Sequence, residues 1–85
     1  GGPSIAIAEN KILTNLKIYP NPTDGMINIE TLETIQSIRV CNIHGQQLDI
    51  PIHNNQVDLS DISRGVYVIH ITTVKGGVSR KIIRN

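Results

Sequence analysis

The stretch "DLSDISRGVYVIHI", residues 58–71, decides the fold of this 85-residue chain. Its second half begins a run of β-branched and aliphatic residues that continues to Val74 and carries bulk on both faces. One face has Val66, Val68 and Val74, and the other has Tyr67, Ile69 and Ile71. Such side chains favour strands, and bulk on both faces is typical of a strand inside a sheet. The stretch therefore predicts a central β-strand entered through a turn at Gly65.

The residues just before this strand resemble the tyrosine corner of immunoglobulin-like sandwiches. In that corner, the hydroxyl of a tyrosine bonds back to a backbone group a few residues upstream. Ile62, Gly65 and Tyr67 would fill the places of the apolar residue, the glycine and the tyrosine. The alternative is that Tyr67 is simply a core aromatic residue, and the sequence leaves both interpretations open.

Turn signals divide the rest of the chain into short β-rich runs. They are Asp24-Gly25, His44-Gly45, Arg64-Gly65 and Gly76-Gly77, and helical patterns are missing after about residue 16. Apolar residues alternate within the runs, as with Ile27 and Ile29. Strands are predicted near 16–19, 26–30, 36–43, 46–50, 56–59, 66–74 and 77–84. About seven short strands predict an all-β fold, an immunoglobulin-like antiparallel β-sandwich.

Length and charge restrict the functions that such a domain can have. Residues 1–4 are interpreted as an expression remnant, residues 5–15 as a linker and residues 16–85 as the folded domain. A domain this small buries only about 60 to 65% of its unfolded surface, which leaves little room for an enclosed active site. The net charge of +1, with scattered basic residues, argues against a nucleic-acid partner. The sequence has no apolar run of membrane-spanning length and no signal peptide, which would lie on a parent chain if this is a fragment.

The polar residues do not form a recognisable catalytic or metal site. His44, His53 and His70 lack the spacing of metal ligands, and no nucleophile sits on a known elbow motif, so we expect neither an enzyme nor a cofactor. Asp58 and Asp61 are predicted to cap a turn, although a loose calcium site using both stays open.

The stretch "NPTDG", residues 21–25, superficially resembles an EF-hand loop. That interpretation fails because Pro20 and Pro22 would occupy ligand positions without a side-chain oxygen. Cys41 has no partner for an internal disulfide and is predicted to be a small apolar filler, facing away from Ile38 and Val40. Tyr19 and Tyr67 are the only aromatic residues, which weakens a carbohydrate-binding hypothesis.

Four segments in a fixed order carry a resemblance to a known family. They are "IYPNPTDG" at 18–25, "IRVCNIHGQQL" at 38–48, "VDLSDISRGVYVIHI" at 57–71 and "SRKIIRN" at 79–85. Together they resemble the type A C-terminal sorting domain of type IX secretion cargo in Bacteroidota, over residues 16–85. The family's motif positions correspond to Pro20, Asn21, Pro22, Gly25, Gly45, Leu59, Gly65, Tyr67 and Lys81. The chain departs from the family at Cys41, where tyrosine is common, and at Asn85, which extends past the usual basic end.

The resemblance implies an exported protein in which this domain is a transport address with no catalysis of its own. The domain would be the last part of a larger cargo protein and would interact with the type IX translocon, an outer-membrane shuttle protein and a sortase. It would pass through the periplasm and reach the outer membrane or cell surface, or be released after cleavage within or before the linker. The competing hypothesis is a stand-alone immunoglobulin-like module for adhesion or for binding carbohydrate or protein.

Two segments are candidates for recognition by the machinery. Arg80, Lys81 and Arg84 lie on a terminal strand whose exposed backbone and charge suit docking, strand addition or a homodimer through edge strands. A merely solubilising basic edge is the alternative. The turn from Pro20 to Gly25 is either read by the machinery or purely structural, and the sequence leaves this open as well.

Overall fold

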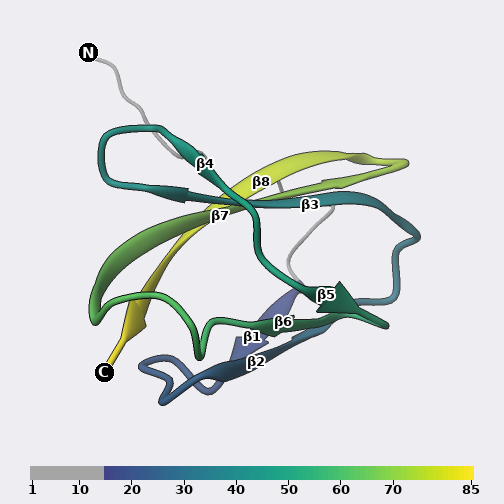
Figure 1. Cartoon of the computed structure of the whole chain (residues 1–85). Helices are drawn as coiled ribbons and strands as arrows, with labels where there is room; N and C mark the ends of the chain where they lie inside the picture. Colours follow the sequence, from purple (N-terminus) through teal and green to yellow (C-terminus); the bar gives the residue numbers. More distant parts are fainter. Residues whose placement is uncertain (1–14) are drawn as a thin grey trace, which may run out of the picture.

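The computed structural model describes residues 15–85, which form two four-stranded antiparallel sheets packed face to face (Figure 1). One sheet has the strand order β1-β2-β6-β5 and the other β4-β3-β7-β8. The strands are β1 (Lys17–Tyr19), β2 (Met26–Glu30), β3 (Ile35–Asn42), β4 (Gln47–Leu48), β5 (Ile52–His53), β6 (Gln56–Asp58), β7 (Gly65–Thr73) and β8 (Gly76–Arg84). The described residues contain no helix, and so none that could cross a membrane. The predicted all-β sandwich is confirmed, while the predicted remnant and nearly all of the linker lie outside the described residues.

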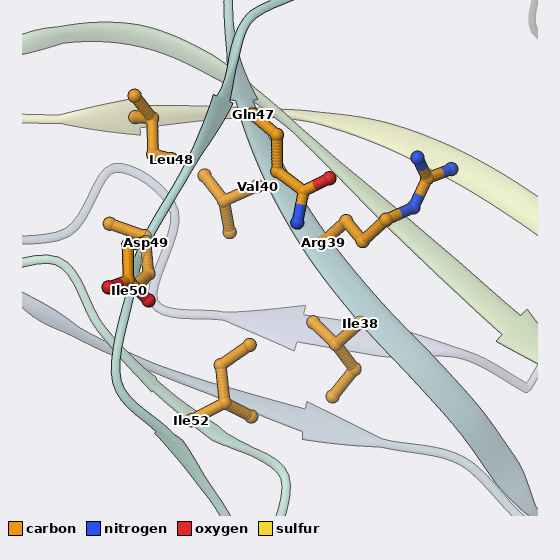
Figure 2. A pocket seen from close by; sticks show the side chains of 8 residues that line it. All are labelled: Ile38, Arg39, Val40, Gln47, Leu48, Asp49, Ile50 and Ile52. Atoms are coloured by element: carbon orange, nitrogen blue, oxygen red, sulfur yellow. The ribbon is translucent and has the colours of Figure 1, made fainter.

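The structure has one strand more than the sequence predicted, and the difference lies between residues 46 and 56. The chain leaves the second sheet after Leu48 and crosses to the first sheet, where β5 pairs with β6. Figure 2 shows this crossing, with Ile38 and Ile52 on one side of it. Asn54 and Asn55, at φ values of 50° and 66°, form the tight turn from β5 to β6. A strand of two residues is too short to show alternation, which is why β5 was missed.

The core lies between the two sheets and follows the predicted alternation. Strand β7 is central, between β3 and β8, and its odd-numbered residues from Tyr67 to Thr73 are buried while its other face is half-buried or exposed. This confirms the prediction for the stretch at 66–74. The buried apolar cluster is formed by Leu16, Ile27, Ile29, Val40, Val57, Leu59, Tyr67, Ile69, Ile71, Val78 and Ile82.

The tyrosine corner is confirmed. The Tyr67 hydroxyl donates a hydrogen bond of 2.7 Å to the backbone carbonyl of Ser63, four residues upstream. Gly65 has a φ of 152°, a conformation that favours glycine, at the start of the same strand. The corner thus fixes the loop that leads from β6 into the central strand.

Antiparallel connections gather the loops at two opposite ends of the sandwich (Figure 1). One end holds the turn at 20–25, the β3–β4 turn at 43–46, the β6–β7 loop at 59–64 and Asn85. We call it the clasp end. The other end holds the β2–β3 loop at 31–34, the β5–β6 turn at 54–55 and the β7–β8 turn at 74–75, and we call it the hairpin end.

Candidate functional site

The turn between β1 and β2 packs alongside the end of β8, about 60 residues later in the chain. The Thr23 amide donates to the Ile83 carbonyl at 2.8 Å, and the Asn85 amide donates to the Thr23 carbonyl at 2.8 Å. These bonds form a short parallel bridge between Thr23 and Arg84. The turn therefore continues the second sheet beyond β8 by a single residue.

Asn21 extends this pairing with its side chain. Its Nδ2 donates to the Lys81 carbonyl at 3.0 Å, and its Oδ1 accepts from the Ile83 amide at 3.0 Å. The side-chain amide thus supplies one donor and one acceptor, as the backbone of a neighbouring strand would. The outer edge of β8 from Lys81 to Asn85 is consequently covered. The expectation of an open backbone along the terminal strand is wrong for these residues.

A third segment, the start of the β6–β7 loop, completes the contact. The Leu59 amide donates to the Gly25 carbonyl at 2.8 Å, and Arg84 Nε donates to the Leu59 carbonyl at 3.0 Å. A Cβ atom on Gly25 would lie 3.3 Å from the Cβ of Ser60, so glycine permits the close approach of the two loops. We call residues 20–25, 59–60 and 81–85, joined in this way, the clasp.

Thr23 lies at the centre of the clasp and was missed by the sequence reasoning. Its side chain is buried, and its Oγ1 accepts from the Gly25 amide at 3.0 Å and donates to the Met26 carbonyl at 2.7 Å. The available signal was a threonine two residues before a turn glycine, a position where the hydroxyl often bonds to the local backbone. That signal predicts the local bonds but not the pairing with Ile83.

The structure brings most of the candidate site residues together and separates the others. Those in the clasp are Pro20, Asn21, Pro22, Gly25, Leu59, Lys81 and Arg84. Pro20 and Pro22 are exposed within the turn, and both follow cis peptide bonds. Gly65 and Tyr67 belong to the tyrosine corner at the same end, and Gly45 takes a φ of 83° in the separate β3–β4 turn.

The three basic residues of β8 do not form one exposed cationic surface. Lys81 is exposed. Arg80 is paired with buried Ile69 and is itself half-buried, on the face that points toward the other sheet. The Arg84 guanidinium is held by carbonyls of the clasp, including that of Ser60 at 3.3 Å. The idea of a charged docking strand is therefore corrected to a single exposed cation, Lys81.

The carboxylate of Asp58, next to the clasp, caps the turn that follows it. Asp58 Oδ1 accepts from the Ser60 amide at 2.9 Å and also from the Ser60 hydroxyl. These two bonds, the hydroxyl first, hold the pKa of Asp58 below its ordinary value. The prediction that Asp58 caps a turn is confirmed. Across residues 15–85, no three His, Cys, Asp or Glu side chains gather in a way that could hold a metal ion.

Cys41 lies where alternation predicted. It is paired with Val68, on the outer face of the second sheet, and its side chain is nonetheless buried. It is absent from the apolar cluster between the sheets. The cysteine therefore fills space on the outer face of that sheet, away from Ile38 and Val40.

Comparisons with known proteins agree with the motif reading. Residues 17–85 match the family described as "Secretion system C-terminal sorting domain". The chain is also 30% identical over 70 residues to Beta-agarase D of Zobellia galactanivorans, an alignment that covers 80% of this chain and 14% of the agarase. No solved structure matches the chain. The chain belongs to the secretion system C-terminal sorting domain family, whose members are the C-terminal sorting signals of type IX secretion.

Proposed function

We propose that the domain acts as a folded address on a larger cargo protein and that the clasp end is the part that the export machinery reads. The partners are the type IX outer-membrane translocon, its shuttle protein and a cell-surface sortase. The cargo passes through the periplasm and stays at the cell surface or is released there. The observation that supports this is the convergence of the turn, the β6–β7 loop and the terminal strand in the clasp.

The clasp presents a mixture of fixed and accessible groups. Its hydrogen bonds occupy Asn21, Thr23 and Arg84, so these residues hold the surface in shape. Lys81 remains exposed beside the turn. A rigid surface with few mobile side chains loses little entropy on binding, which suits recognition of many cargo proteins through the same domain.

Removal by the sortase would take place before the folded domain. Leu16 is buried, and Asn15 Oδ1 accepts a hydrogen bond of 2.9 Å from the Thr31 hydroxyl, so both residues are held against the folded domain. A protease needs backbone that can be drawn out as an extended strand. Cleavage is therefore proposed on the N-terminal side of Asn15.

A reporter fusion tests the proposed function. Residues 5–85 are joined to the C-terminus of a periplasm-directed fluorescent protein and expressed in a Bacteroidota host. Fluorescence on the surface of wild-type cells, together with periplasmic retention in translocon-deficient cells, is the expected result. Reporter that stays periplasmic in wild-type cells contradicts the proposal and favours the stand-alone adhesion module. So does reporter that reaches the surface without the translocon.

The variant Lys81→Gln asks whether the clasp is read or only shapes the domain. The side chain is exposed, so the variant should unfold at the same temperature as the wild type while the surface reporter falls. Lys17→Gln, at an exposed position on β1 of the other sheet, is the matched control and should be exported normally. Equal export of both variants would show that the lysine of the clasp is not recognised.

A further inference from the structure

The outer face of the second sheet has a composition that its fold does not require. The strand register shows which residues of β3, β7 and β8 point away from the core. Arg39 pairs with His70, and Val68 pairs with both Cys41 and Lys81. Side chains of paired residues lie on the same face of a sheet. The face therefore carries the basic Arg39 and Lys81, the apolar Cys41, Val66, Val68 and Ile83, and the polar Ser37, Gln47, His70, Thr72 and Ser79, and we call it the outer face.

The outer face has an apolar strip of Cys41, Val66, Val68 and Ile83, and beside it a polar pair in which His70 Nδ1 lies 2.6 Å from Ser79 Oγ. Cys41 is buried, and Val68 and Ile83 are half-buried, whereas Arg39 and Lys81 are exposed. None of these residues is acidic, and neither exposed cation forms an ion pair within residues 15–85. Figure 2 shows Arg39 extending away from Ile38 and Ile52, whose side chains lie on the other side of β3.

We propose that the outer face docks onto an acidic surface of a protein of the export machinery, with Arg39 as a specificity residue. This rests on the proposed function and extends the recognised surface from Lys81 across the sheet. Two strand spacings and two residues of offset place the Cα atoms of Arg39 and Lys81 about 12 Å apart. The partner would present carboxylates at about this separation, one on each side of β7, with Val68 and His70 between them.

A lipid surface is the less suitable occupant. Peripheral membrane binding relies on protruding aromatic or leucine side chains and several basic residues. The outer face has two exposed cations and, apart from the half-buried imidazole of His70, no aromatic ring, and its apolar residues are cysteine, valine and isoleucine. An apolar patch beside polar and basic side chains instead resembles the centre and rim of protein interfaces.

The test uses the reporter fusion and compares a charge reversal on the outer face with a charge reversal elsewhere on the domain. Arg39→Glu should lower surface reporter about tenfold, because a rim charge facing its own sign both slows and weakens association. Arg39→Lys, which keeps the positive charge, should lose less export than Arg39→Glu. Lys75→Glu, an equally exposed reversal in the β7–β8 turn, should export normally. Val68→Lys should lower export because it places a charge in the apolar strip. The variant removes no positive charge, so its effect reports on the strip alone.

Folding is checked by thermal unfolding of the same chain carrying each variant, and only variants that unfold near the wild-type temperature are compared. Normal export of Arg39→Glu, while the wild type still requires the translocon, overturns this inference and leaves the proposed function standing. Failure of the wild-type fusion itself counts against the proposed function instead. Arg39-dependent flotation of the chain with vesicles of equal phosphatidylglycerol and phosphatidylcholine would overturn the protein partner in favour of a membrane.

Discussion

The two ends of the sandwich are built in different ways. At the clasp end, bonds join residues as far apart as Asn21 and Ile83, 62 positions along the chain. At the hairpin end, turns are largely satisfied by their own neighbours, as where Thr73 Oγ1 donates to the Gly76 carbonyl and accepts from the Lys75 amide. Local turns depend on local sequence, whereas the clasp exists only when the whole domain is folded. Substitutions at the clasp end should therefore act on the global fold, and those at the hairpin end should not.

The largest effect is expected from Leu59→Ala. Leu59 is fully buried and its backbone joins two parts of the clasp. The substitution should lower the free energy of unfolding by about 2 to 5 kcal/mol, through lost burial and the cavity left behind. Urea denaturation followed by circular dichroism measures it. Leu32→Ser at the hairpin end is the control and should change stability by less than about 0.5 kcal/mol, because Leu32 is 89% exposed.

Asn21→Ala should have the next largest effect. Losing the bonds to Lys81 and Ile83 should cost about 1 to 2 kcal/mol, since two backbone groups lose a partner but regain water. Hydrogen exchange should show faster exchange of the Ile83 amide. The Val74 amide, which donates to Thr34 at the hairpin end, should keep its rate. Equal acceleration at both amides would show that the two ends are not separable.

Tyr67→Phe should cost about 1 kcal/mol, because the Ser63 carbonyl loses its hydrogen bond while the ring stays in the core. The bond spans four residues, so it tests a local contact at the clasp end. A shift of the urea midpoint without a change in slope is expected. A smaller slope would instead indicate that the corner is needed for compact folding of the whole sheet.

The pH dependence of the clasp end should follow Asp58. Its pKa is lowered in the fold by the Ser60 hydrogen bonds, so its contribution is fully present above the ordinary value of 3.8 and is lost as pH falls through the lowered pKa. Thermal unfolding of the wild type and of Asp58→Asn should therefore converge at acidic pH. Curves that remain parallel below pH 3.8 would show that the carboxylate does not stabilise the loop.

The smallest effect is expected at the hairpin end from Asn55→Gly. Asn55 has a φ of 66°, which glycine adopts without steric cost, so stability should rise by at most about 0.5 kcal/mol. Calorimetry of both chains measures the change. A loss larger than about 1 kcal/mol would mean that the Asn55 side chain has a role beyond the turn.

The sequence predicted features that depend on neighbouring residues. Alternation located β7 and its inward residues, and the spacing of Gly65 and Tyr67 indicated the tyrosine corner. It did not predict that Asn21 would bond to β8 or that Arg84 would bond to Leu59, because nothing in a local pattern specifies a partner about 25 to 60 residues away. The basic terminus was misjudged for the same reason. Side-chain charge is visible in the sequence, whereas the face of the strand on which it lies depends on register.

The bond between Asn21 and the Lys81 carbonyl also determines when folding can finish. The two residues are separated by 60 positions. Closing so long a loop costs entropy before the hydrogen bond can contribute favourable free energy. As the chain is synthesised, the turn emerges before its partner strand and can close only once residues 81–85 have followed. A chain interrupted before Lys81 carries the turn but has nothing to close it. The complete clasp can therefore form only in a chain that has been translated through residue 85.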